Sequence, residues 1–361
     1  MLTMENLTVG YNGKAVISDI NVNIEQGSIV TLIGPNGAGK STILKSIAKQ
    51  LEPICGAVYL EGKEIARMSA KDMAKGLSVV FTDRIRTELM TCREVAALGR
   101  YPHTGYFGRL DDKDIAIVEE ALQRVGAQDI AHRDFDRISD GQKQKVLIAR
   151  AICQQTPVIV LDEPTSYLDI KHKIEILEVL KNMAKEHNTT IIMSLHEIDL
   201  ASKVSDIVMC VKDNRIDCCG AAEDIFTSPY ISRLYDIDRG FYNALTGSTE
   251  LEKMQGECKT FVIAGGGFGI PVYRKLQKDN IPFATGILYE NDVDYQVAQA
   301  LAGEVVTAPS FTKVTDETIK RAVELIEKAD VVIDAKTPVG DYNTEKNILI
   351  EAAGGKLREW K

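Results

Sequence analysis

The sequence predicts an α/β protein made of two consecutive domains, and three observations predict it. An apolar, β-branched run at 29–33 precedes a glycine-rich stretch, and apolar residues at helical spacing follow. Apolar strands recur at 158–161 and 190–194, and each runs into polar residues. After residue 247 strands and helices begin to alternate anew, which predicts a second parallel sheet. We expect domains at 1–247, with a helical insert at about 88–155, and at 255–361.

The composition limits the classes of protein to consider. The 361 residues carry a net charge of −9, which argues against a nucleic-acid binder, since such proteins usually present a basic face. The apolar runs are far shorter than the ~18 residues that a membrane span requires, and no secretion leader is visible. Seven cysteines without framework spacing fit a reducing compartment. We therefore expect a cytosolic protein, in which Cys218 and Cys219 are strand residues rather than a metal or redox site.

The glycine-rich stretch matches the phosphate-loop pattern G-x-x-x-x-G-K-S/T at every fixed position. It consists of Gly34, Pro35, Asn36, Gly37, Ala38, Gly39, Lys40, Ser41 and Thr42. The glycines let the backbone wrap around a polyphosphate, and the helix that begins near Lys40 adds its positive dipole end. We expect Lys40 to neutralise the β- and γ-phosphates and Ser41 to hold Mg²⁺.

The rest of the first domain is predicted to mix strands with a helical insert. Strands at 2–9 and 20–24 flank a Gly-Tyr-Asn-Gly turn, in which Tyr11 could stack on a base or be a simple surface residue. A short helix is expected near 69–75 and a strand at 77–81. From about residue 88 helical periodicity dominates, around a polar loop at 99–105. Ser139 and Gln142 then have capping-box spacing, so a helix begins here, and Gly141 leaves its amides open to an anion.

Two carboxylates follow the apolar strand 158–161. Asp162 and Glu163 are costly at the edge of a buried strand unless they have a function, and this edge is where open α/β sheets bind ligands. Asp162 can hold Mg²⁺ through water, and Glu163 can polarise an attacking water. His196 follows the next strand, and its position favours a functional role over that of an ordinary surface histidine.

The ordered motifs of residues 1 to about 245 resemble the ATP-binding cassette (ABC) ATPases. The motifs are the phosphate loop, the signature 138–142, the Asp162-Glu163 strand end, the loop 166–169 and His196. The resemblance implies a mixed β-subdomain, a RecA-like core and a helical insert. It further implies that two copies sandwich two ATP molecules, with Ser139, Gly141 and Gln142 of one copy facing the phosphate loop of the other. Tyr11 then stacks on adenine, Ser41 and Asp162 bind Mg²⁺, Glu163 is the base, His196 contacts the γ-phosphate, and Asp169 lies among the nucleotide-binding residues.

The run 93–102 is similar to ATPase subunits of importers for iron–siderophore, haem or cobalamin. This resemblance implies a homodimer on the inner face of the membrane, two integral membrane permease subunits and an indirect partnership with an extracytoplasmic substrate-binding protein. The segment 82–105 is expected to face the permease. The alternative is a soluble ABC ATPase, or a nucleotide-dependent regulator, that is not coupled to transport.

The segment after strand 77–81 departs from the family pattern. The family has a glutamine here that touches Mg²⁺ and couples the site to the membrane subunits, whereas Thr82 or Asp83 stands in this sequence. A threonine is shorter and reaches less far. We assign Thr82 no catalytic role, although Asp83 could reach the metal.

The C-terminal extension predicts a small Rossmann-like α/β domain. Strands are expected at 260–264, 283–289, 304–307 and 331–334, with helices near 272–276, 293–301 and 316–329. The glycines at 265–269 resemble a dinucleotide-binding turn, but Ile270 replaces the third glycine of that motif. Glu290 and Asp292 could meet a ribose. A small-ligand regulatory site and a purely structural or dimerising module remain equally supported.

Overall fold

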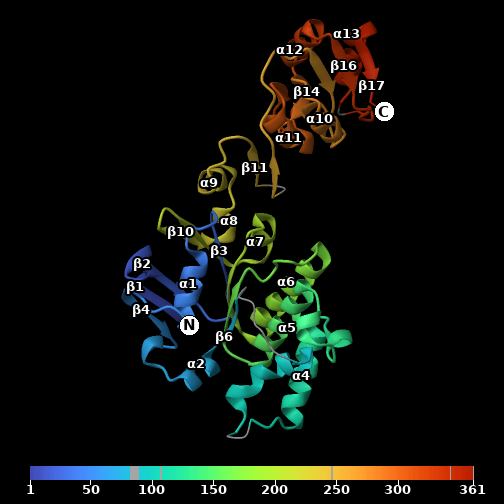
Figure 1. Cartoon of the computed structure of the whole chain (residues 1–361). Helices are drawn as coiled ribbons and strands as arrows, with labels where there is room; N and C mark the ends of the chain where they lie inside the picture. Colours follow the sequence, from blue (N-terminus) through green and yellow to red (C-terminus); the bar gives the residue numbers. More distant parts are fainter. Residues whose placement is uncertain (82–88, 106–107, 245–246, 342, 361) are drawn as a thin grey trace. The chain divides into compact units, whose positions relative to one another are not determined.

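The computed structural model describes residues 1–81, 89–105, 108–244, 247–341 and 343–360. The chain divides into two compact units, Met1–Phe226 and Thr227–Lys361, shown from blue through red in Figure 1. Among the described residues, no helix combines the length and the apolar character needed to cross a bilayer. The second unit begins at Thr227, whereas the sequence predicted a first domain that extends to residue 247 and a second that starts at residue 255.

The first unit contains two sheets that enclose one helix. An antiparallel sheet has the order β2-β1-β4-β5, and a six-stranded sheet has the order β10-β9-β3-β8-β7-β6, in which only β10 is antiparallel to its neighbour. Helix α1 (Lys40–Ile47) lies between them, because its apolar residues join the core that both sheets share. The first sheet consists of β1 (Leu2–Tyr11), β2 (Lys14–Ile24), β4 (Cys55–Leu60) and β5 (Lys63–Glu64). The second consists of β3 (Ile29–Ile33), β6 (Leu77–Val80), β7 (Val158–Asp162), β8 (Thr190–Ser194), β9 (Ile207–Lys212) and β10 (Arg215–Ala221).

Helices cover the six-stranded sheet and form the insert. The predicted helical insert is present, and its helices α3, α4 and α5 pack on one another. Figure 1 shows α4 and α5 of this insert. The helices of this unit are η1 (Ile65–Arg67), α2 (Ala70–Gly76), α3 (Cys92–Ala97), η2 (Leu98–His103), α4 (Asp112–Arg124), η3 (Gln128–Ile130), η4 (Phe135–Arg137), α5 (Asp140–Cys153), α6 (Ile170–His187), α7 (Ile198–Val204) and α8 (Ala222–Ile225). Cys218 and Cys219 lie in β10, as the sequence predicted.

The segment expected as a polar loop at 99–105 is instead mostly helical. Residues 98–103 form the 3₁₀ helix η2, and Arg100 is only 6% exposed. Its guanidinium donates to Asp114 Oδ1 (2.8 Å) and to the carbonyl of Cys153 (2.7 Å). The hydrogen bond from Arg100 lowers the pKa of Asp114. The expectation was wrong because helical spacing does not reveal a cation that is buried by a partner 14 residues away.

The second unit is a parallel sheet with the order β15-β14-β13-β16-β17. This order confirms the predicted Rossmann-like fold, since the strand order reverses between β13 and β16. Helices α10 and α11 pack on one face, and α12 and α13 pack on the other. The strands are β13 (Thr260–Ile263), β14 (Phe283–Tyr289), β15 (Glu304–Ala308), β16 (Val331–Asp334) and β17 (Leu357–Glu359); the helices are α10 (Gly269–Lys278), α11 (Val293–Leu301), α12 (Asp316–Lys328), α13 (Glu345–Ala353) and η5 (Gly354–Lys356).

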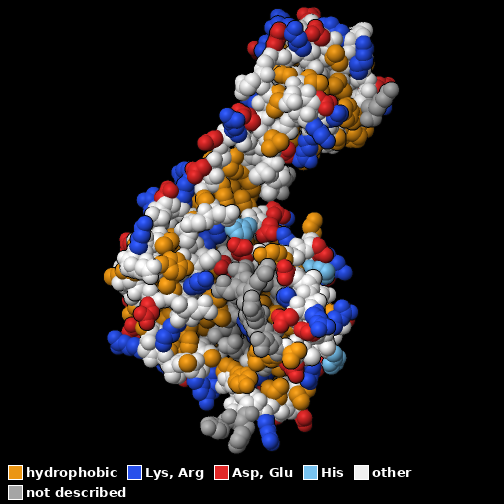
Figure 2. Space-filling view, viewed as in Figure 1, with side chains coloured by type: hydrophobic (Ala, Val, Ile, Leu, Met, Phe, Trp, Pro, Cys, Tyr) orange, Lys and Arg blue, Asp and Glu red, His pale blue; other side chains and the backbone are white. Residues whose placement is uncertain are grey.

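The sequence interpretation missed several elements of the second unit. They are α9 (Ser228–Leu234), the hairpin of β11 (Phe241–Asn243) and β12 (Ser248–Glu250), α13, η5 and β17. The hairpin contacts α11, and Glu250 pairs with Arg274 of α10. These contacts explain why the unit starts before residue 247. Figure 2 shows hydrophobic side chains gathered on the visible surface of this unit.

Candidate functional site

The phosphate loop joins β3 to α1, as predicted, and its glycines have the required conformations. Gly34, Gly37 and Gly39 have φ angles of 142°, 78° and 106°. A Cβ atom on Gly34 would lie 2.1 Å from the carbonyl oxygen of Val211, so only glycine fits there. Space is open around Gly37. Because Gly39 is the N-cap of α1 and has no side chain, the first amides of this helix have no side-chain cap from that residue.

Lys40 lies buried across the loop. Its Nζ donates to the carbonyl oxygens of Gly34 (2.7 Å) and Pro35 (3.0 Å), and the residue is 6% exposed. Burial lowers the pKa of Lys40, while the negative charges of Glu163 and Asp162 partly offset that shift. The lysine is therefore held at the centre of the loop, within the electrostatic reach of both carboxylates.

Asp162 and Glu163 lie at the carboxyl end of β7, beside the phosphate loop. Strands β3, β8 and β7 are adjacent and parallel, so their carboxyl ends share one edge. Ser194, the last residue of β8, donates its hydroxyl to Asp162 Oδ1 (2.6 Å) and accepts the backbone N–H of Glu163 (2.9 Å). Sequence reasoning missed Ser194. The pairing of the two predicted strands was the signal that could have found it, since Asp162 and Ser194 are partners in register.

The Glu163 carboxylate is oriented by two side chains. Its Oε1 lies 2.5 Å from His196 Nε2, and its Oε2 accepts the hydroxyl of Ser166 at 3.0 Å. Glu163 also has a φ of 50°, a left-handed conformation that is strained for a residue with a side chain. Strain of this kind concentrates at functional sites. The arrangement holds a partly exposed carboxylate in direct contact with an imidazole.

The loop after Glu163 is tied to the turn that carries His196. Thr165 donates its hydroxyl to Glu197 Oε2 (3.0 Å), and Lys173 of α6 forms an ion pair with the same carboxylate. Asp169 is the N-cap of α6, where its Oδ1 accepts the backbone N–H of His172 at 2.9 Å. This hydrogen bond lowers the pKa of Asp169.

The signature segment begins α5 with the predicted capping box. Ser139 Oγ accepts the N–H of Gln142 (3.3 Å), and the Gln142 side chain accepts the N–H of Ser139 (3.2 Å). A Cβ atom on Gly141 would lie 2.9 Å from the carbonyl oxygen of Tyr167, so the helix start packs closely on the loop after β7. Within one chain the signature segment therefore belongs to the helical insert, where α5 packs with α3 and α4. The phosphate loop instead leads into α1, in the core between the two sheets.

The structure describes the predicted adenine-stacking residue but not the residues after strand 77–81 that depart from the family pattern. Tyr11 ends β1 and is 47% exposed, so its ring is accessible. Thr82 and Asp83 lie outside the described residues.

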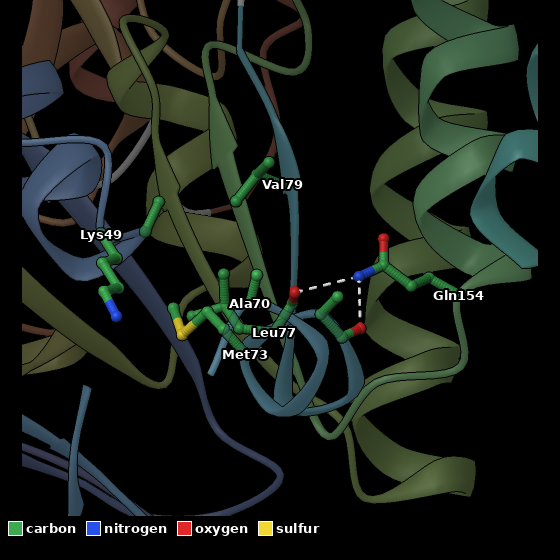
Figure 3. A pocket seen from close by; sticks show the side chains of 8 residues that line it. Lys49, Ala70, Met73, Leu77, Val79 and Gln154 are labelled. Carbon is green, nitrogen blue, oxygen red and sulfur yellow. Dashed lines mark hydrogen bonds between the residues drawn. The ribbon is translucent and has the colours of Figure 1, made fainter. Parts of the chain in front are cut away.

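A hollow of about 370 Å³ lies between the end of α1, helix α2 and strand β6 (Figure 3). Gln154, at the end of α5, donates to the carbonyl oxygens of Ala74 (2.6 Å) and Leu77 (3.1 Å), as the dashed lines show. These bonds fasten the insert to the start of β6. The lining residues are Ala48, Lys49, Ala70, Met73, Ala74, Leu77, Val79 and Gln154.

Two carboxylates at the start of α11 accept hydrogen bonds from the glycine loop of the second unit and from the start of α10. Asp292 Oδ2 accepts the N–H of Gly266 (2.8 Å). Asp294, fully buried, accepts the N–H groups of Gly269 (2.9 Å) and Ile270 (3.0 Å) at the start of α10. Asp292, which was considered as a ribose ligand, thus binds the loop itself, and the buried Asp294 was missed.

Two family models match the chain. The model described as "ABC transporter" matches residues 17–166, and the model "MJ0874 family" matches residues 283–358. The second match covers part of the C-terminal unit.

Several curated proteins are similar over long stretches. An ABC transporter ATP-binding protein of Methanocaldococcus jannaschii is 42% identical, over 80% of this chain and 100% of its own length. The iron(3+)-hydroxamate import ATP-binding protein FhuC of Bacillus subtilis is 39% identical, over 66% of this chain and 88% of its own. The cobalamin import ATP-binding protein BtuD of Halobacterium salinarum is 31% identical, over 92% of this chain and 85% of its own.

This chain is also similar to a solved structure. A dimeric ATP-binding cassette in a post-hydrolysis state, bound to ADP and Pi, has a TM-score of 0.57 and 26% identity, and the match covers 62% of this chain and 99% of that one. The strand–loop–helix geometry around Lys40, the strand ends at Asp162 and Ser194, and these similarities agree. The chain therefore belongs to the ATP-binding cassette transporter family and is an ABC ATPase.

Proposed function

We propose that this chain is the ATPase subunit of an importer and that it hydrolyses ATP between two copies of itself. The observation that carries the proposal is the alignment of Asp162, Glu163 and His196 beside Lys40 at one edge of the sheet. In this proposal the loop 34–42 binds the phosphates and Tyr11 stacks on adenine. Ser139, Gly141 and Gln142 complete the site from the second copy, and Asp169 is a further nucleotide-binding residue.

The residues fit a magnesium nucleotide. The loop is shaped by glycines, it contains a buried lysine, and a carboxylate and a hydroxyl are available at Asp162 and Ser41. These two residues would hold Mg²⁺, which neutralises phosphate charge when bound. Oxygen ligands of this kind are the ones Mg²⁺ prefers.

The catalytic work of the chain's own residues is positioning and electrostatics, as in phosphoryl transfer generally. We assign to Glu163 the role of orienting the attacking water and accepting its proton, because Ser166 and His196 fix its carboxylate. His196 exchanges its bond to Glu163 for a contact with the γ-phosphate. Lys40 holds the β- and γ-phosphates from the floor of the loop.

Glu163→Gln tests this assignment. The variant keeps the size of the side chain and one acceptor oxygen but cannot accept the proton, so we expect ATP binding to persist while turnover falls at least ~100-fold. Size-exclusion chromatography with MgATP should show a trapped dimer. Glu178→Gln, on the exposed part of α6, is the matched control and should behave as wild type. Wild-type turnover in Glu163→Gln would remove Glu163 as the base.

The proposed transported compound is an iron chelate or a cobalamin-type molecule, because the similar proteins of known name import these. Two integral membrane permease subunits and an extracytoplasmic substrate-binding protein would accompany the homodimer, which would sit on the inner face of the membrane. Membrane subunits and the substrate-binding protein, rather than this chain, would select the compound.

We propose that the permease contacts the hollow of Figure 3 and the neighbouring segment 89–105. Leu89 is 90% exposed and Tyr101 is 64% exposed, so apolar side chains are available there. A photo-reactive benzoylphenylalanine at Tyr101 should cross-link to the permease in membranes, whereas the same residue at Ile54, exposed elsewhere in this unit, should not. Cross-linking at Ile54 alone would contradict the proposed surface.

A further inference from the structure

A cavity of about 960 Å³ opens at the carboxyl edge of the C-terminal sheet. Its walls come from the end of β14, from the residues that follow β14, β15 and β16, and from the first turns of α12 and α13. The carboxyl edge is where open parallel sheets bind ligands. The volume lies within the ~300–1,000 Å³ that small-molecule sites occupy.

The inner wall of this cavity is a continuation of the hydrophobic core. Tyr289, Val314 and Ile319 are partly buried side chains that pack against the core cluster beneath α12 and α13. Ile348 of α13 faces the same cavity and is 45% exposed. The core is therefore left open at this end, and its apolar surface is available to a ligand.

Phe311 stands at the cavity in a conformation that costs stability. It is 93% exposed, and its φ is 59°. It is the third residue of a turn in which Thr312 N–H donates to the carbonyl of Pro309 (3.4 Å), a position that favours glycine when φ is positive. Strained residues of this kind cluster at ligand clamps. The ring of Phe311 is therefore exposed beside an apolar cavity, in a backbone conformation that lowers the stability of the fold.

The charges at the cavity favour a cation. Of the described residues that line it, Asp341 and Glu345 are acidic and Lys313 is basic. The amides that bind phosphate in other Rossmann-like domains are already bonded to Asp292 and Asp294 here. A phosphate-bearing ligand would meet carboxylates in both places, whereas the rings of Tyr289 and Phe311 suit a flat cation.

We propose that the C-terminal unit binds a flat, mainly apolar organic cation in this cavity, between Phe311 and the first turn of α13. The apolar wall holds the body of the molecule, Phe311 covers it, and Asp341 and Glu345 face its positive charge. This proposal does not depend on the transport role proposed for the chain.

A matched pair of fluorescent probes tests the proposal with the full chain. The cation is 9-aminoacridine and the anion is 9-anthracenecarboxylate, which share a three-ring frame and differ in charge. Titrations are made with excess MgADP, so that the nucleotide site is occupied. We expect saturable binding of the cation at one site, at least tenfold tighter than the anion. No saturation, or preference for the anion, would overturn the proposal.

Matched variants locate the binding. Ile348→Lys, which places a positive charge in the cavity, should weaken the cation at least tenfold. Ile281→Lys, at a similarly exposed isoleucine of the same unit outside the cavity, should not. Glu345→Gln should weaken it severalfold, and Glu351→Gln, on the same helix but outside the cavity, should leave it unchanged. Binding that ignores Ile348→Lys would place the probe elsewhere and refute the site.

Phe311→Gly separates a ligand role from a folding role. Glycine relieves the left-handed strain, so the unfolding midpoint of this unit should stay the same or rise, while the affinity for 9-aminoacridine should fall about tenfold. The midpoint can be followed by the fluorescence of Trp360, the single tryptophan, which packs in this unit. Unchanged affinity in Phe311→Gly would contradict the proposed clamp.

Discussion

The two units of this chain contain the same strand–glycine loop–helix arrangement and use it in opposite ways. In the first, β3 leads through Gly34–Gly39 into α1, and a buried lysine lies across the loop. In the second, β13 leads through Gly265–Gly267 into α10, and the half-buried Asp292 and the buried Asp294 accept amide hydrogens of the loop and of the start of α10. The first loop can bind an anion from solution, whereas the second loop already binds two carboxylates of its own chain.

The difference arises from the residues at the carboxyl end of the neighbouring strand. In the second unit β14 is adjacent to β13, so the first turn of α11 reaches the glycine loop and brings Asp292 and Asp294 to it. In the first unit β8 lies next to β3, and the carboxylates come from β7, one strand further away. Ser194 donates to Asp162, while Glu163 contacts His196 and Ser166. The second loop is the one whose amides the structure shows bonded to carboxylates of the chain itself.

The largest effect is expected from removing the lysine of the first loop. Lys40→Ala takes away the cation that neutralises the phosphates, so turnover at saturating MgATP should fall at least ~100-fold and nucleotide affinity should drop. Lys336→Ala is the control, since Lys336 follows β16 near the second loop and pairs with exposed Glu359. A phosphate-release assay and nucleotide titration should show no change for it. Equal losses in both variants would break the comparison.

A second, smaller effect is expected from Asp294→Ala. The variant leaves the buried N–H of Gly269 and the partly buried N–H of Ile270 without this acceptor, which should cost about 2–4 kcal/mol of unfolding free energy. Trp360 fluorescence in denaturant reports this unit selectively, and ATPase activity reports the other unit and should persist. Asp316→Ala, at the exposed first turn of α12, should change stability by under about 0.5 kcal/mol. A stable Asp294→Ala protein that binds nucleotide at 265–270 would show that the second loop is also a phosphate site.

Much of both units can be predicted from local sequence. The strands 29–33, 190–194, 283–289 and 331–334 coincide with their predicted bounds because each is a short, mainly apolar run. The phosphate loop and the capping box of α5 were predictable because their chemistry lies within a few consecutive residues. These parts depend on backbone conformation rather than on tertiary contacts.

The parts that escaped prediction depend on side chains that meet across the fold. Ser194 is one of many serines until strand pairing places it beside Asp162. Arg100 is typical of a surface loop until Asp114 and the end of α5 enclose it. Asp294 resembles an ordinary first-turn acid of α11, and only the sheet order reveals that it caps α10. Each case needs a distance between segments that no local pattern contains.

The smallest effect tests how the second loop tolerates its buried charge. Desolvation, with Asp292 nearby, raises the pKa of Asp294 above its ordinary value despite the amide bonds. The native state therefore holds this proton more tightly than the unfolded chain. The stability from this carboxyl is then fully present below the unfolded pKa of about 3.9 and is lost as pH rises through the higher native pKa.

Asp294→Asn has no carboxyl to titrate at this position. The unfolding midpoint, followed by Trp360 fluorescence, should therefore fall in wild type relative to Asp294→Asn as pH rises through that window, and the difference should then level off. Asp316→Asn serves as the control with an exposed carboxyl. A wild-type advantage that grows with pH would mean that the two amides favour the ionised form more than burial opposes it, and the second loop would then match the first in its affinity for negative charge.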